Sequence, residues 1–366
     1  LGHDFFITPL ISSISIRNWK NYITNEQMAQ LKQYKRTNIF PIFLKAPDSR
    51  FRNLLNPLIL WRDFISIFSV INRIRPNVIV CYYVLDAYPL VILKILFNYS
   101  LCVVATGGDI NLKRGLMYRM IRKFIYLGCD LFFATSRELK DKIEREHNCN
   151  VMVVPTGADS SFFKPLDLRT TLRRKWGIGQ EEKVILTVCR LVKNKGIDVI
   201  IKALGLLKRS QQRDTELLIV GDGPERTSLK ELASKLQIQQ KTIFLSSRSR
   251  AELLELYNLT DIFVLASYSE GSPRALFEAM ACGCISISTN VGDVPRIILN
   301  EFNGFLVKPG DPANLAEKIN EVLSLPDNEI SHIKSRARST VVNSFDQRKS
   351  AERMIDVIIS KFHFSK

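Results

Sequence analysis

Residues 269–283, which read SEGSPRALFEAMACG, contain the transition that decides the fold class. An apolar run at 262–266 directly before them predicts a buried strand, and Gly271 predicts a turn. Pro273 suits the first turn of a helix, and Gly283 suits its end. A buried strand that leads through a short loop into a helix is the repeating unit of a parallel α/β sheet.

The same alternation runs through the whole chain. Strands are predicted at residues 5–7, 39–44, 78–83, 102–106, 131–135 and 151–155, and again at 184–189, 216–220, 242–245, 262–266 and 284–288. Helices are predicted at 58–74, 196–208, 225–235, 251–258, 273–281 and 312–325, the first with a core stripe of Trp61, Phe64, Ile65, Phe68 and Ile71. The order predicts an α/β protein of two Rossmann-like, doubly wound domains facing across a cleft, with ligands at the carboxyl ends of the strands.

We expect an N-terminal domain at residues 1–165, a second domain at 166–345, and a C-terminal helix at 346–366 that packs back on the first. The join falls in a polar stretch at 164–179 that holds Pro165 and a basic cluster. The apolar region 87–105 is broken by Lys94, Asn98 and Ser100, so it predicts a buried helix followed by a strand rather than a membrane span.

Composition narrows the class of protein. The formal net charge of +16 favours an anionic ligand, which could be a nucleic acid, a lipid head group or a phosphorylated substrate, although a solubilising surface explains it equally well. The seven cysteines include no Cys-x-x-Cys pair, and the four histidines form no metal-ligand pattern. We therefore expect free thiols in the cytoplasm, no metal site and no cofactor. No nucleic-acid-binding motif is visible.

Two carboxylates and two cations are the candidate site residues. The N-terminus of the helix at 273–281 offers backbone N–H groups to an anion, and Glu270 and Glu278 can accept hydrogen bonds from hydroxyl groups. Arg190 and Lys195 follow the strand at 184–189 and can offset the charge of a diphosphate. The alternatives are an exposed helix position for Glu278 and ordinary solvated cations for the other two.

Several segments match a known family in order as well as content. They are Pro155, Gly157, Asp159, Phe163 and Pro165; Arg190 with Lys195 and Gly196; Gly221, Gly223 and Pro224; Glu270 and Glu278 in a Glu-x7-Glu spacing; and residues 304–307. Together they resemble the retaining glycosyltransferases of family four, which have the GT-B fold. The match is strongest from residue 151 to residue 322.

The resemblance implies a role for each matching residue. Arg190 and Lys195 would hold the donor diphosphate, Glu270 the transferred sugar and Glu278 the ribose hydroxyls. The backbone of Gly271, Ser272 and Pro273 would line the sugar and phosphate. Gly221, Gly223 and Ser246 complete the predicted donor site.

The chain also departs from the family pattern. Ser246 and Arg296 stand where relatives usually have Gly and Glu. The segment 106–111 has no His, so Asp109 or a backbone carbonyl would act near the reacting sugar. Residues 1–9 resemble the family's second strand, so the first strand and its Gly-rich loop are expected to be missing, which puts the activity of this chain in question.

The predicted function is metal-independent retaining transfer of a sugar from a nucleotide diphosphate sugar to a hydroxyl of a glycan or lipid-linked acceptor, in polysaccharide or glycolipid biosynthesis. A nucleotide-sugar epimerase or hydrolase of the same fold and a non-catalytic anion-binding protein are the alternatives. The helix near 114–127 carries Arg119, Arg122 and Lys123 beside Met117, Met120, Phe124 and Ile125. It could lie on an anionic membrane surface, or it could be an ordinary amphipathic helix with a basic outer face.

Overall fold

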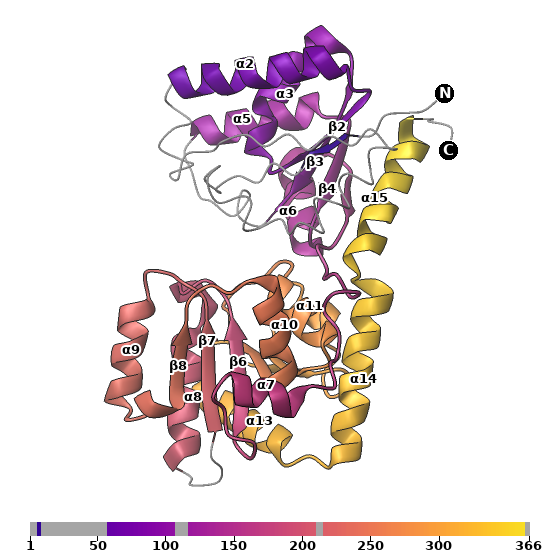
Figure 1. Cartoon of the computed structure of the whole chain (residues 1–366). Helices are drawn as coiled ribbons and strands as arrows, with labels where there is room; N and C mark the ends of the chain where they lie inside the picture. Colours follow the sequence, from indigo (N-terminus) through magenta and orange to yellow (C-terminus); the bar gives the residue numbers. More distant parts are fainter. Residues whose placement is uncertain (1–5, 9–56, 107–115, 210–214, 363–366) are drawn as a thin grey trace. The chain divides into compact units, whose positions relative to one another are not determined.

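The chain folds into two compact units. The computed structural model describes residues 6–8, 57–106, 116–209 and 215–362, so the strand predicted at 39–44 lies outside the described residues. The first unit comprises residues 1–154 and 355–366, and the second comprises residues 155–354 (Figure 1).

The first unit is built on five parallel strands in the order β1-β2-β3-β4-β5. They are β1 Phe6–Thr8, β2 Val78–Tyr82, β3 Ser100–Ala105, β4 Leu131–Ala134 and β5 Val151–Val153. The helices are α2 Pro57–Ile74, α3 Tyr88–Phe97, α5 Leu116–Gly128 and α6 Arg137–His147. β4 is buried along its whole length, as expected for a central parallel strand that is an unbroken apolar run. The predicted strands from residue 78 to residue 155 are confirmed.

Two expectations about burial in this unit are wrong. In the stripe predicted for α2, Ile71 is 2% exposed, but Ile65 is 50% and Phe68 is 38% exposed. The helix α3, predicted to be buried, exposes Ile95 and Leu96 at its C-terminal end. Apolar periodicity predicts that these side chains share a face of a helix, but it does not show that another element covers that face.

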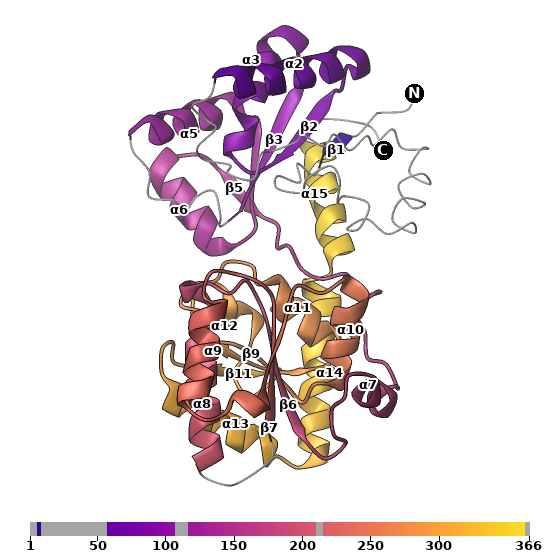
Figure 2. The same cartoon turned by 60° about the vertical axis from the view of Figure 1, so that its left-hand side comes forward.

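The second unit is built on six parallel strands in the order β11-β10-β9-β6-β7-β8. Figure 2 labels β6, β7, β9 and β11 among them. They are β6 Lys183–Val188, β7 Thr215–Val220, β8 Thr242–Leu245, β9 Ile262–Leu265, β10 Ile285–Thr289 and β11 Phe305–Val307. The chain first adds β7 and β8 on one side of β6, and then returns to add β9 on the other side, where Ile185 pairs with Ile262. This change of direction between β6 and β9 is a topological switch point.

Helices cover both faces of this sheet. One apolar core contains side chains of α7 Arg169–Lys175, α10 Arg250–Leu259, α11 Arg274–Ala281, α12 Val294–Ile297 and α14 Asp327–Ser344. The other core contains side chains of α8 Ile197–Arg209, α9 Arg226–Lys235 and α13 Pro312–Leu323. The last helix is α15 Gln347–Phe362.

Across the described parts of both units, no helix is long and apolar enough to cross a bilayer.

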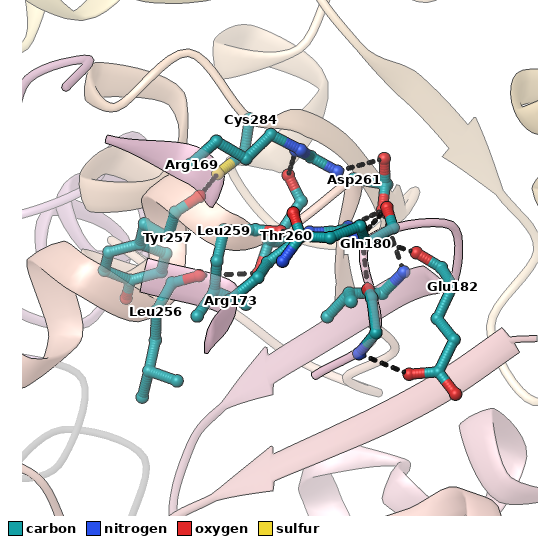
Figure 3. Close-up of polar contacts among 12 residues, drawn as sticks. Arg169, Arg173, Gln180, Glu182, Leu256, Tyr257, Leu259, Thr260, Asp261 and Cys284 are labelled. Carbon is teal, nitrogen blue, oxygen red and sulfur yellow. Dashed lines mark hydrogen bonds and ion pairs between the residues drawn. The ribbon is translucent and has the colours of Figure 1, made fainter. Parts of the chain in front are cut away.

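The basic segment predicted as a polar join contains α7 and a buried cation. Arg173 is only 1% exposed, and its guanidinium pairs with Asp261 Oδ2 at 2.8 Å (Figure 3). Arg169 reaches the other oxygen of the same carboxylate at 2.7 Å. Arg173 also donates to the backbone carbonyl oxygens of Gly179, Gln180, Glu182 and Leu259 at 2.8–3.3 Å. The cation therefore ties α7 to the chain segments that precede β6 and β9.

Replacing Arg173 with Met should destabilise the second unit strongly. The substitution leaves Asp261 and several carbonyl oxygens without their donor, so we expect the free energy of unfolding in urea to fall by about 3–5 kcal/mol. Arg169→Met is the matched control, because Arg169 lies on the same helix and pairs with the same carboxylate, but its side chain is 39% exposed. The control should cost about 1 kcal/mol or less. Equal losses in the two variants would contradict the role given to Arg173.

Candidate active site

Two loops meet at the switch point of the second unit. The loop after β6 and the loop after β9 leave neighbouring strands, and the backbone N–H of Tyr268 donates to the carbonyl of Asn194 at 2.9 Å. The side chain of Asn194 donates to the carbonyl of Ser269 at 3.3 Å. Gly196 has φ +60°, and a Cβ there would lie 2.0 Å from the carbonyl oxygen of Ala266. Only glycine permits this close approach, which holds the two loops together.

An ion pair joins these two loops. Lys195 Nζ lies 2.5 Å from Glu270 Oε1, and the same oxygen accepts a hydrogen bond from Ser267 Oγ at 2.6 Å. Glu270 is 8% exposed and Ser267 is fully buried, whereas the side chain of Lys195 is 24% exposed, so the carboxylate is largely shielded from water while its cationic partner is partly accessible. Among the described residues, neither donor contacts Oε2 of Glu270, and that oxygen can accept a hydrogen bond from a ligand.

The loop after β10 supports the same site from the next strand. Thr289 Oγ1 donates to the carbonyl oxygen of Ser267 at 2.6 Å, and the backbone N–H of Asp293 donates to the carbonyl oxygen of Glu270 at 3.4 Å. Sequence reasoning missed both Ser267 and Thr289. Ser267 lies only three residues before Glu270 in the same loop, but a serine in a loop carries no signal of its own. Thr289 acts from the neighbouring strand β10, a contact that the spacing along the chain does not reveal.

The helix α11 begins directly beside Glu270. Pro273 is its N-cap, and the carbonyl of Pro273 accepts the N–H of Leu276 at 3.1 Å. The first N–H groups of a helix have no partner within it, so this end of α11 favours an anion. Ser272 Oγ accepts the backbone N–H of Thr156 at 3.2 Å. Residues 155–157, which belong to the motif at the start of this unit, therefore lie beside the loop after β9.

Glu278 lies deeper than Glu270 and has a different partner. It is 8% exposed, and the hydroxyl of Tyr257 on α10 donates to its Oε2 at 3.0 Å. Burial raises the pKa of Glu278 above its usual range, while the hydrogen bond from Tyr257 and the charges of Arg274 and Arg250 act in the opposite direction. Glu278 is thus a buried carboxylate whose single hydrogen-bonding side-chain partner is neutral among the described residues. The alternative of an exposed helix position is wrong.

The remaining candidates lie along the same edge of the sheet. Arg190 is exposed in the loop after β6. A Cβ on Gly221 would lie 2.0 Å from the carbonyl oxygen of Cys189, and a Cβ on Gly223 would lie 2.3 Å from that of Leu191. Both glycines therefore allow the loops after β6 and β7 to pack closely. Ser246 is exposed in the loop after β8. Asp109 lies outside the described residues.

A cavity of about 390 Å³ lies beside this edge, between the loop after β6 and α9. Lys193 and Tyr268 are among its lining residues, whereas Lys195, Glu270 and Glu278 are not. These three candidate residues therefore lie outside this cavity. No group of three or more His, Cys, Asp or Glu side chains that could hold a metal ion occurs in the described ranges.

The segment that contains these candidate residues matches a known protein family. Residues 169–340, which include Arg190, Lys195, Glu270 and Glu278, match the model of the family "Glycosyl transferases group 1". The chain is 30% identical over 203 residues to N-acetyl-alpha-D-glucosaminyl L-malate synthase of Bacillus anthracis, a match that covers 55% of this chain and 51% of that protein. It is 34% identical over 203 residues to D-inositol 3-phosphate glycosyltransferase of Corynebacterium jeikeium, covering 53% and 48% of the two chains. The chain thus spans about half the length of the curated relatives that it matches.

The fold has a counterpart among solved structures. A glycosyltransferase from Rickettsia africae superposes with a TM-score of 0.78 at 19% identity, and the match covers 99% of this chain and 100% of that one. This likeness confirms the predicted α/β architecture of two Rossmann-like domains. The family match falls within the second of these two units.

Proposed function

We propose that this chain is a retaining glycosyltransferase of family four that moves a sugar from a nucleotide diphosphate sugar to a hydroxyl of a glycan or lipid-linked acceptor. The observation that carries the proposal is the contact between Lys195 and Glu270 at the switch point of the second unit. A cation and a carboxylate that meet beside a helix N-terminus suit a ligand in which a diphosphate is linked to a polyhydroxylated ring.

Each group has a distinct task in this proposal. Lys195 and Arg190 offset the charge that grows on the diphosphate as the glycosidic bond breaks, which is the task that a divalent cation performs in other enzymes. The N–H groups at the start of α11 bind phosphate oxygens, and Oε2 of Glu270 accepts a hydrogen bond from a sugar hydroxyl. Glu278 binds the ribose hydroxyls of the donor. Asp109 or a backbone carbonyl near it acts on the acceptor side.

The proposed reaction retains the anomeric configuration without a covalent enzyme intermediate. The bond between the anomeric carbon and the diphosphate oxygen breaks, and the acceptor hydroxyl attacks the same face of the oxocarbenium-like centre. The hydroxyl proton leaves with the diphosphate. The protein then contributes mainly positioning and charge stabilisation, which agrees with a site made of fixed donors rather than a nucleophile.

The donor side is supported more strongly than the acceptor side. The family match falls within the second unit, and the names of the two relatives include different acceptors, L-malate and D-inositol 3-phosphate. A thermal-shift screen with uridine, guanosine and adenosine diphosphate sugars therefore comes first, because a ligand that binds the folded state raises the melting temperature. Product analysis with and without an acceptor then separates transfer from hydrolysis or epimerisation of the donor.

Removing either member of the ion pair should abolish most of the transfer activity. For Lys195→Ala and for Glu270→Ala we expect kcat/KM for the donor to fall by about a hundredfold or more, since each variant loses a charged group at the reacting centre. Circular dichroism should show both variants folded. Lys193→Ala is the matched control for the lysine, because Lys193 is an exposed cation in the same loop. Transfer at the normal rate by the Lys195 variant would refute the proposal.

The hydroxyl of Tyr257 should set the pH dependence of donor binding. Tyr257→Phe removes the neutral donor that lowers the pKa of Glu278, so this pKa should rise further and more of Glu278 should be protonated at a given pH. The acid limb of kcat/KM for the donor should move to higher pH, with a loss of about tenfold below it. Tyr88→Phe, in the first unit, is the control. An unchanged profile would mean that Tyr257 does not position Glu278 for binding.

A further inference from the structure

The helices α2, α3 and α5 of the first unit expose large apolar side chains. The most exposed are Ile95 (83%), Leu127 (78%) and Leu116 (72%). The full set, named here the α2–α3–α5 apolar face, is Ile65, Phe68, Ile95, Leu96, Leu116, Met117, Met120, Phe124 and Leu127. A cluster of this kind on three neighbouring helices differs from the scattered apolar residues of an ordinary protein surface.

The helix α5 has two apolar sides. Met117, Met120, Phe124 and Leu127 recur at intervals of three or four residues, so they form one stripe along the helix, and all four are exposed. Ile125 is fully buried on another side. The packing of α5 in the core of the unit is therefore provided mainly by a different set of residues, and its outer face is apolar as well as basic.

The helix α3 connects this stripe to α2. The rings of Tyr88 on α3 and Phe124 on α5 lie 5.8 Å apart, and Lys94 Nζ donates to the carbonyl of Gly128 at the end of α5. At the C-terminal end of α3, the ring of Phe97 packs on that of Phe68 of α2, with ring centroids 5.2 Å apart. Figures 1 and 2 both draw the three helices side by side. The exposed side chains thus lie on one group of packed helices.

The charge on α3 and α5 has one sign. The two helices contain Lys94, Arg119, Arg122 and Lys123 but no Asp or Glu. Lys94 pairs with Asp130, and Arg122 lies 3.9 Å from Glu146, whereas Arg119 and Lys123 are exposed beside the apolar stripe of α5. An apolar stripe flanked by exposed cations is complementary to a surface with an apolar interior and anionic head groups.

We infer that the α2–α3–α5 apolar face docks on the surface of a bilayer that contains anionic phospholipids. The helix α5 has 13 residues, so it lies along the surface rather than across the bilayer. Its Met, Leu and Phe side chains enter the boundary between head groups and acyl chains, and Arg119 and Lys123 remain among the head groups. This binding needs no sugar donor, so it can be tested independently of the proposed transfer reaction.

Co-sedimentation of the full chain with vesicles tests the apolar contribution. Vesicles of phosphatidylcholine mixed with phosphatidylglycerol should bind the protein, and Met120→Ser/Leu127→Ser should weaken binding by about tenfold or more. The control Leu206→Ser/Leu299→Ser removes two exposed leucines of the second unit and should leave binding unchanged. All four side chains are exposed, so both variants should remain folded. Equal effects of the two double substitutions would overturn the inference.

A second pair of variants tests the charge. Arg119→Gln/Lys123→Gln should reduce binding to vesicles with phosphatidylglycerol by about tenfold or more. Lys235→Gln/Lys349→Gln removes the same net charge from exposed positions elsewhere and should have little effect. Binding that does not depend on phosphatidylglycerol would overturn the inference. A dimer would also overturn it. If the unaltered protein does not bind vesicles, and gel filtration shows that it is a dimer that the apolar double substitution converts into a monomer, then the face joins two copies of the chain.

Discussion

The change of winding direction between β6 and β9 is the constraint on which the candidate site depends. Ile185 pairs with Ile262, so the loops that follow these adjacent strands begin side by side, but they lead to α8 on one face of the sheet and to α11 on the other. Because no helix crosses this point, the edge between the loops is open to a ligand. Gly196 lets the loops touch through their backbones, and Lys195 and Glu270 then reach one another.

The two glutamates show different solutions to the cost of burying a carboxylate. Glu270 is compensated by a cation and a hydroxyl on one oxygen, whereas Glu278 has a hydrogen bond from the neutral Tyr257. A desolvated carboxylate without full compensation gains free energy from any ligand that brings hydroxyl donors. In the proposed reaction, the hydroxyl groups of the donor supply these hydrogen bonds, and burial raises the pKa of Glu278, the carboxylate without a cationic hydrogen-bond partner.

The sequence is enough to predict most strands of the two sheets, because apolar alternation marks them, but the edge strand β11 was missed. It also predicts the convergence of Lys195 with Glu270, because parallel strands bring their following loops to one edge. The supporting contacts could not be predicted. Tyr257 reaches Glu278, and Thr289 reaches Ser267, from positions more than 20 residues away that only the tertiary structure brings together. Arg173 lies in a polar, basic segment that indicates a solvated linker, yet the carbonyl groups around it make it one of the most buried large side chains.

The helix α5 also shows what sequence periodicity cannot predict, here for apolar residues that remain exposed. Residues that recur every three or four positions predict an apolar stripe, but an identical pattern arises whether the stripe faces a core, a partner or a bilayer. The tertiary structure narrows these three possibilities, because it shows which residues of the helix pack in the core of the unit. Ile125 occupies the core of the first unit, whereas the stripe through Phe124 stays exposed at its surface. In the inference made above, the neighbouring cations Arg119 and Lys123 then select an anionic surface to cover the stripe.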